Sequence, residues 1–177
     1  MLEILRKLCA MEIREGGISD KSFSELSSQE KAKLEPRNGR HYLKAEERRK
    51  IRVGLAGGVF DVLHLGHVFM LSEAKKRCDV LAVVIASDAH IAKKGREPVY
   101  PQEYRTRMVD FLKPVDVAIA GGKDYTETLA RVKPDVIIYG YDQPEFLKPS
   151  GVEIIKLHEH LEPEKLKSSK IIKELGL

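Results

Sequence analysis

The sequence of 177 residues is poor in cysteine and contains no long apolar run. Its two cysteines, Cys9 and Cys78, exclude a disulfide framework, and neither has a Cys or His at metal-ligand spacing. No stretch approaches the roughly 18 apolar residues that would span a bilayer. The first residues mix acids and bases into the apolar positions, so we expect no signal peptide. These absences predict a globular protein of the reducing cytoplasm without a membrane partner.

Positive charge exceeds negative charge only slightly. The chain has 31 Lys and Arg against 27 Asp and Glu, a formal net charge of +4. Most of this excess lies in residues 1–50. Because basic helix faces are usually solvated surface, we expect no nucleic-acid partner from charge alone.

Short runs rich in Val and Ile alternate with amphipathic stretches from residue 51 onward. The predicted strands are residues 51–57, 80–86, 115–121, 135–140 and 152–157. The predicted helices between and after them are residues 67–78, 102–113, 125–132 and 168–175. The strands are continuously apolar, as strands covered on both faces are. The alternation predicts an α/β fold with a doubly wound parallel sheet, in which ligands bind beyond the carboxyl ends of the strands.

Residues 1–50 have a different pattern from residues 51–177, and we predict a domain boundary between them. Two helical patches, residues 2–13 and 23–34, precede an Asn-Gly turn flanked by basic and aromatic residues. This mainly helical order resembles a shortened winged helix. The extension is therefore either a DNA-binding element or an element that caps the second domain or forms a dimer. We favour the second reading and expect a homodimer.

The stretch from Gly57 to His67 follows the first predicted strand and opens the first helix. Gly57 and Gly58 would let the backbone turn sharply and approach a ligand, and Gly66 would keep the helix start open to a phosphate. His64 and His67 can present two imidazoles to that phosphate. In phosphoryl transfer the catalyst mainly positions groups and neutralises charge on oxygen atoms. We therefore expect a catalytic pair, with helix capping as the alternative.

The segment His64-Leu65-Gly66-His67, preceded by Gly-Gly-Val-Phe-Asp, resembles the signature of the HxGH nucleotidylyltransferases. These enzymes join a nucleoside triphosphate to a phosphorylated small molecule and release pyrophosphate. The resemblance covers about residues 51–177 and implies a Rossmann-like fold. It also implies that both histidines bind the nucleotide together with Val59, Phe60, Leu65 and Gly66, and that Asp61 binds the acceptor substrate.

Further segments resemble the cytidylyltransferase-like branch of that family. Lys94 and Arg96 follow the second predicted strand and match basic residues that hold phosphates. The resemblance implies a catalytic and acceptor-binding role for Lys94 and a nucleotide-binding role for Arg96; an ordinary basic surface loop is the alternative. Arg105 and Lys113 match acceptor-binding positions in the next helix and at its end. For Arg105, a structural salt bridge is an equal alternative.

The last two matching segments concern the nucleotide. Asp142, just beyond the fourth predicted strand, matches the position that recognises the base. Ser168 and Ser169 open the last helix, where they bind phosphate or act as N-caps. Cytidylyltransferases carry R-T-x-G-I-S-T-T there, and this sequence lacks the Arg-Thr and Gly-Ile elements. In that respect it is more similar to archaeal FAD synthases.

The resemblance therefore implies an adenylyltransferase that joins ATP and FMN to give FAD and pyrophosphate. Mg²⁺ or another divalent cation is expected on the triphosphate oxygens, since no Asp/Glu cluster provides protein ligands for a metal. One alternative is a cytidylyltransferase that uses CTP with glycerol 3-phosphate or another phospho-polyol. A non-enzyme alternative is a DNA-binding regulator that senses a nucleotide.

Overall fold

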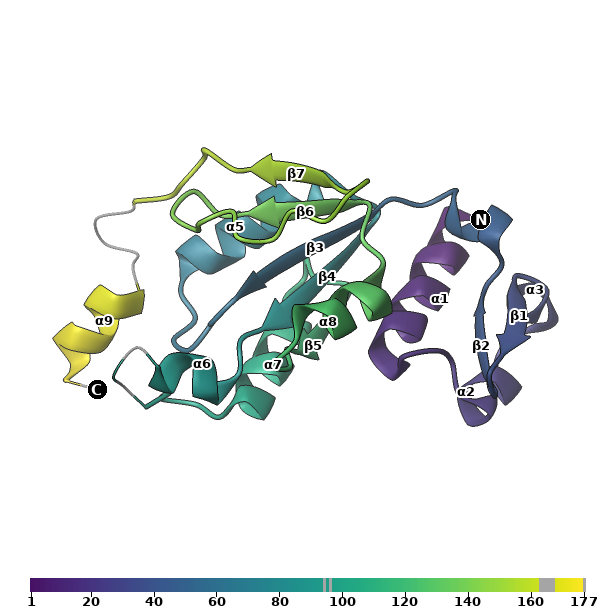
Figure 1. Ribbon diagram of the computed structural model, residues 1–177, viewed down its shortest axis with the longest axis horizontal. Helices are drawn as coiled ribbons and strands as arrows, with labels where there is room; N and C mark the ends of the chain where they lie inside the picture. The colour runs from purple at the N-terminus through teal and green to yellow at the C-terminus, as the bar shows by residue number, and fades with distance from the viewer. Residues whose placement is uncertain (94, 96, 163–167, 177) are drawn as a thin grey trace.

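Five parallel strands form the central sheet, and each lies where the sequence predicts it (Figure 1). They are β3 (Val53–Gly58), β4 (Val80–Ile85), β5 (Val117–Ala120), β6 (Val136–Tyr139) and β7 (Glu153–Lys156). The computed structural model describes residues 1–93, 95, 97–162 and 168–176. The strand order is β5-β4-β3-β6-β7, so the direction of winding reverses between β3 and β6. Ligands of doubly wound sheets bind beyond the strand ends at such a reversal.

Both faces of the sheet are buried, which explains the continuous apolar runs. In β4, Val80 and Ala82 belong to one hydrophobic cluster, and Leu81, Val83 and Ile85 belong to the other. Helices α5 (Leu65–Lys75) and α7 (Gln102–Asp110) cover the second cluster. Helix α8 (Tyr125–Val132) covers the first, together with α1 (Leu2–Glu15). The predicted doubly wound α/β fold is confirmed.

Helix α1 packs directly on the sheet. Its buried residues Leu5, Leu8, Cys9 and Ile13 share one cluster with side chains of the central strands. The helix contacts β4 and β5 and ends at Gly16, which has a left-handed φ of 69°. These four residues of α1 are thus buried against their own chain and are not available for a dimer interface.

The rest of the N-terminal segment consists of short elements. These are α2 (Asp20–Ser24), α3 (Ser28–Lys31), a hairpin of β1 (Leu34–Arg37) and β2 (Arg40–Leu43), and α4 (Ala45–Arg48). The prediction of one helix over residues 23–34 is wrong, because Ser27 caps a separate helix in a capping box with Glu30. Asn38 and Gly39 both have positive φ, as a tight hairpin turn requires. Helix α3 has four residues and is about 6 Å long, and this is the length of helix that could enter a DNA groove.

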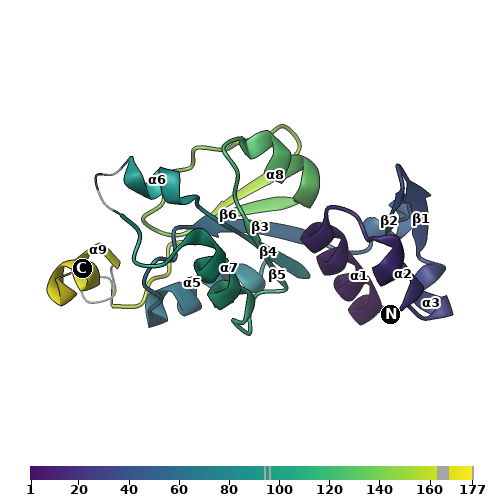
Figure 2. The same cartoon turned by 90° about the horizontal axis from the view of Figure 1, so that it is seen from below.

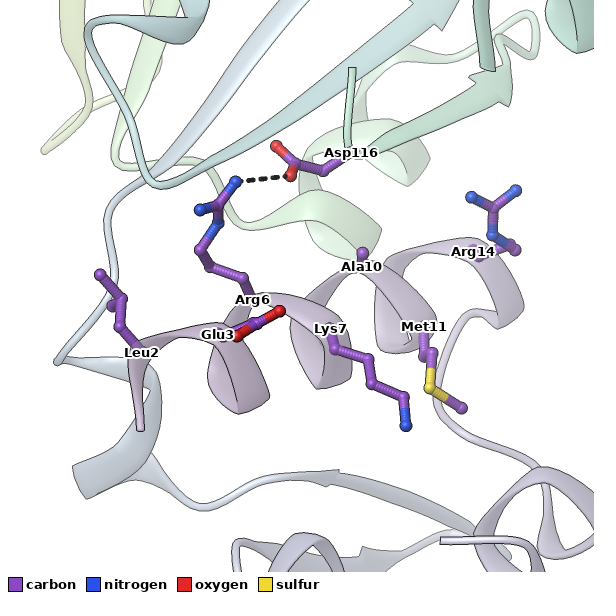
Figure 3. Close-up of a pocket in the computed structure, with 8 residues that line it drawn as sticks. All are labelled: Leu2, Glu3, Arg6, Lys7, Ala10, Met11, Arg14 and Asp116. Atoms are coloured by element: carbon purple, nitrogen blue, oxygen red, sulfur yellow. Dashed lines mark hydrogen bonds and ion pairs between the residues drawn. The ribbon is translucent and has the colours of Figure 1, made fainter. Parts of the chain in front are cut away.

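Charged side chains fasten this segment to the ends of other elements. Arg6 donates to Asp116 at 3.2 Å beside a surface groove of about 660 Å³ on α1 (Figure 3). Arg14 forms a bidentate pair with Asp110 at the end of α7, with N–O distances of 2.6 and 3.1 Å. The segment lies at the end of the sheet where the strands begin (Figures 1 and 2).

Two helices lie at the opposite end, where the strands finish (Figures 1 and 2). They are α6 (Asp88–Ala92), which the sequence did not predict, and α9 (Ser168–Leu175), which it did. Among the described residues, no helix combines the length and the apolar character needed to cross a bilayer.

Candidate active site

The two histidines of the motif meet at the first turn of α5, just beyond the end of β3. His64 is the N-cap, and its backbone N–H donates to Nδ1 of His67 at 3.4 Å. The two imidazole rings stack, with centroids 3.9 Å apart and planes 26° from parallel. Because Nδ1 of His67 accepts this bond, the neutral ring carries its proton on Nε2 and can donate it to a ligand. The structure thus brings the two predicted catalytic side chains together.

Burial keeps the paired imidazoles neutral at physiological pH. Burial, with a smaller contribution from the neighbouring His64, lowers the pKa of His67 to about 3. Burial also lowers the pKa of His64, while the carboxylate of Asp142 partly opposes this shift. Asp142 is exposed in the turn after β6, so its charge acts across the point where the strand order reverses. Two neutral N–H donors therefore start the helix, whose dipole also favours an anion.

Phe60 occupies an unusual backbone conformation in the loop between β3 and α5. Its φ is +50°, and its ring is buried beside the His67 ring at a centroid distance of 5.1 Å. A bulky residue rarely adopts a left-handed conformation, and such strain gathers at functional sites. The expected sharp turn at Gly57 and Gly58 is wrong, since neither has a positive φ.

Gly57 and Gly58 are instead required by close packing. A Cβ atom on Gly57 would lie 2.9 Å from Cγ1 of Val84, and one on Gly58 would lie 2.7 Å from the Phe60 ring. The first contact lets β3 approach β4, and the second lets the Phe60 ring fold back over the strand end. The two glycines therefore shape the loop from within.

Arg105 lies in the interior, which corrects its assignment as a substrate-binding residue. The side chain has no exposed surface. It donates to the carbonyls of Val59 at 2.5 Å, Ala86 at 2.9 Å and Tyr100 at 2.9 Å, and to Asp88 at 2.6 Å. With its donors directed at three loops of the protein, the guanidinium joins the ends of β3 and β4 to the start of α7.

Asp61 is also fully buried, and this corrects its expected contact with substrate. Its Oδ1 accepts hydrogen bonds from the backbone N–H groups of Val99 and Tyr100, at 2.9 and 3.1 Å. The carboxylate therefore fastens the chain before α7 to the loop after β3. Like Arg105, it is buried and holds loops of the site in place.

Lys113 lies at the wrong edge of the sheet for its predicted role. It follows the end of α7 and precedes β5, whereas His64 follows the end of β3. All five strands are parallel, so the residues before a strand and those after one lie at opposite edges. Sequence spacing after the helix could not reveal this, because the nine residues of α7 carry the chain about 13 Å away.

The other candidate residues divide into those the structure places and those it does not describe. Val59 and Leu65 flank the loop, with Leu65 61% exposed, and Gly66 is the second residue of α5. Ser168 and Ser169 begin α9 at the strand-end side of the molecule. Lys94 and Arg96 lie outside the described residues.

Sequence reasoning missed two glutamines that join strand ends. Gln143 donates from Nε2 to the Gly57 carbonyl at 2.8 Å and accepts from the Gly140 N–H at 2.9 Å. Gln102 donates from Nε2 to the carbonyls of Ile85 and Gly121, at 2.8 Å each. The available signal was their position, since Gln143 lies three residues after a predicted strand and Gln102 opens a predicted helix.

The described part of the chain contains no set of side chains that could bind a metal ion. No group of three or more His, Cys, Asp or Glu side chains lies together there. The site instead offers imidazole N–H groups and a helix start, both suited to phosphate oxygens.

Comparison with known proteins assigns the family. The cytidylyltransferase-like family model matches residues 55–174, which include the paired histidines, Asp142 and both glutamines. The chain belongs to the cytidylyltransferase-like family. This confirms the nucleotidylyltransferase resemblance and the Rossmann-like fold that the histidine motif predicts. Residues 1–54 lie outside the matched region.

Within this family the chain is similar to archaeal FAD synthases. It is 39% identical to that of Thermococcus onnurineus over 146 residues, 75% of this chain and 96% of the relative. It is 52% identical to that of Methanopyrus kandleri over 93 residues, 50% of this chain and 62% of the relative. The latter match thus spans less than two thirds of that relative's length.

A solved structure also matches this chain. It is described as a lipopolysaccharide core biosynthesis protein from Thermoplasma volcanium, and it is 36% identical with a TM-score of 0.58. The match covers 63% of this chain and 99% of that protein.

Proposed function

We propose that this protein is an FMN adenylyltransferase, which transfers AMP from ATP to FMN and releases pyrophosphate. The observation that carries the proposal is the pair of stacked, neutral imidazoles at the start of α5, beside the reversal of strand order. Similarity to archaeal FAD synthases, at 39% identity over 96% of one relative, supports FMN as the acceptor. The match of the family model supports nucleotidyl transfer in general.

The reaction needs little covalent chemistry from the protein. A phosphate oxygen of FMN attacks the α-phosphorus of ATP, in line with the bond to the oxygen that bridges to the β-phosphorus. The new P–O bond forms as that bond breaks, and the electron pair leaves with pyrophosphate. Catalysis then rests on positioning and on stabilising the charge that builds on the oxygens.

The two histidines suit that task. The Nε2–H of His67 donates to an oxygen of the reacting phosphate, and His64 contributes from the N-cap beside it. The N–H groups of Leu65 and Gly66 and the dipole of α5 add to the positive potential. In this proposal Asp142 reads the base, Lys94 and Arg96 hold phosphates, and Ser168 and Ser169 bind the nucleotide from α9.

Mg²⁺ enters as part of the nucleotide substrate. Since the described residues form no cluster of metal ligands, the ion is carried by triphosphate oxygens and water. We also propose a cytoplasmic location, because both cysteines are free thiols. Burial raises the pKa of Cys9 to about 12 and that of Cys78 to about 11, so both stay protonated. A homodimer stays a prediction, which sedimentation of the full chain tests.

Pyrophosphate release tests the proposed substrates. The full chain is incubated with Mg²⁺ and with ATP or CTP, each combined with FMN or glycerol 3-phosphate. We expect release with ATP and FMN together, and FAD as the second product by chromatography. Release only with CTP and glycerol 3-phosphate would replace the proposal by the cytidylyltransferase alternative.

A further inference from the structure

The hydrogen-bond ladder between β3 and β6 stops early. The pairing of β3 with β4 continues to Gly58 and Ile85, whereas its pairing with β6 ends at Ala56 and Ile138. Strands β3 and β6 therefore separate two residues sooner, and they do so at the reversal of strand order.

A side chain occupies the place of the next ladder bond. The register of β3 and β6 makes the Gly140 N–H and the Gly57 carbonyl the next donor and acceptor. The Gly57 carbonyl faces β6, because the adjacent Gly58 carbonyl accepts from Ala86 on the β4 side at 2.9 Å. The amide of Gln143 lies between them: its Oε1 accepts from Gly140 and its Nε2 donates to Gly57. One direct bond is thus replaced by two bonds through an inserted amide.

Hydrogen bonds of its own backbone also hold Gln143 in this position. The backbone N–H of Gln143 donates to the Gly140 carbonyl at 3.1 Å, which closes the turn after β6. Lys156 of β7 donates to the Gln143 carbonyl. Asp142, whose charge acts on His64, is the residue just before Gln143. The inserted amide therefore fixes both the spacing of the two strands and the place of Asp142.

We propose that Gln143 is a positioning residue that holds the ends of β3 and β6 apart, so that a nucleoside triphosphate fits between His64 and Asp142. This rests on the proposed nucleotide-binding function of the same site. Without the amide, the Gly140 N–H and the Gly57 carbonyl form the direct ladder bond of about 2.9 Å. The two loops then move toward each other and leave less room for a nucleotide between His64 and Asp142.

Gln102 provides a matched control within the same sheet. It also bridges two strand ends, but there the Gly121 N–H already donates to the Ile85 carbonyl at 2.8 Å. Its amide covers carbonyls beside an intact ladder bond and replaces none. A glutamine that only stabilises the edge should behave like Gln102.

The test compares Gln143→Met with Gln102→Met in the full chain. Both variants keep a long side chain and lose the amide. Calorimetry measures the binding of Mg-ATP and Mg-CTP, and thermal unfolding reports stability. We expect Gln143→Met to weaken binding of the preferred nucleotide about tenfold, and Gln102→Met to stay within about twofold. In a crystal structure of Gln143→Met, Gly140 and Gly57 should be directly hydrogen-bonded.

Gln143→Glu is the second variant, for use where Gln143→Met does not fold. Its carboxylate can accept from Gly140 but repels the Gly57 carbonyl, so we expect the same loss of binding. Unchanged affinity in a folded Gln143 variant, or an equal loss in Gln102→Met, would overturn the proposal.

The binding readout separates this inference from the proposed reaction. Binding is measured without FMN, so a wild type that binds a nucleotide yet makes no FAD refutes the FMN adenylyltransferase proposal alone. A wild type that makes FAD while Gln143 variants bind normally refutes the positioning role alone. Failure of the wild type to bind either nucleotide would refute both.

Discussion

At one edge of the central sheet, side chains accept hydrogen bonds from the backbone, and at the other edge, side chains donate them. Where the strands begin, three aspartate carboxylates each accept a bond from a backbone N–H of the neighbouring strand. The pairs are Asp79 with Arg52, Asp116 with Leu81 and Asp135 with Val53, each at 2.7 Å. Where the strands end, Gln102, Arg105 and Gln143 donate to backbone carbonyls. The difference follows from the backbone, because parallel strands leave N–H groups free at one edge and C=O groups at the other.

The contrast shows why only one edge suits a phosphate. Carboxylates make the first edge negative, and the N-terminal segment then pairs with them through Arg6 and Arg48. At the second edge, exposed carbonyl oxygens would repel a triphosphate. Beside the paired histidines, Arg105 and Gln143 occupy the carbonyls of Val59 and Gly57 from within, so a ligand at this point meets imidazoles and the start of α5. One edge is thus built for attachment and the other for anion binding.

Of the changes that test this contrast, removal of residues 1–50 should have the largest effect on folding and solubility. The sequence alone suggests that a chain beginning near Arg48 still folds, because all five strands lie beyond it. The structure reverses that expectation, since Leu5, Leu8 and Ile13 cover the face of β4 and β5. We expect the truncated chain to be insoluble or to self-associate, as measured by sedimentation and circular dichroism.

The control is Leu2→Ala, since Leu2 lies on the same helix and is 47% exposed. We expect this variant to sediment and unfold like the full chain. A truncated chain that is monomeric, folded and active would show that residues 1–50 are a separate domain, as the sequence boundary predicts.

Substitution of the paired histidines should give the next largest effect, at the other edge. His67→Ala and His64→Ala should each lower kcat about 10²–10³-fold, the usual loss for one preorganised donor. Stability should change little, because both residues face the site. His41→Ala serves as the control: its ring stacks on Phe23 far from the strand ends, so kcat should not change. Wild-type turnover in either site variant contradicts the assignment.

Two aspartate substitutions, one at each edge, test the contrast between the edges. Asp116→Ala leaves the Leu81 N–H without its acceptor and removes the partner of Lys75 and Arg6. We expect denaturant unfolding to show a loss of about 1–3 kcal/mol, with unchanged kcat. Asp142→Ala at the other edge should cost less than about 0.5 kcal/mol and weaken nucleotide binding. The reverse pattern would refute the division between an attachment edge and a binding edge.

Strand positions and the histidine pair could be predicted because their signals are local. Five Val- and Ile-rich runs each need burial on two faces, and a His-x-x-His spacing at a helix start places both rings on one side. The N-terminal hairpin was signalled by Asn38 and Gly39, yet the preceding helix was predicted too long. The N-cap at Ser27 divides that stretch, and this serine was not recognised as a cap.

Side-chain direction could not be predicted in the same way. Arg105 and Asp61 carry the right chemistry for a substrate contact, and only the fold shows that both are enclosed by backbone. The prediction for Lys113 is wrong because the length of α7 decides at which edge of the sheet this residue lies. Gln143 was missed because its role depends on where two distant strands separate, which no local pattern records.

The last expected effect concerns the pH dependence of stability at the binding edge. Burial lowers the pKa of His67 from 6.5 to about 3 in the folded protein, so between these values the unfolded chain binds one more proton. Stability contributed by neutral His67 is therefore complete above pH 6.5 and declines as the pH falls toward 3. Denaturant unfolding of His67→Gln should show a shallower decline than the wild type. The difference should be at most about 1.4 kcal/mol per pH unit. Equal slopes in the wild type and in His67→Gln would contradict a buried neutral His67.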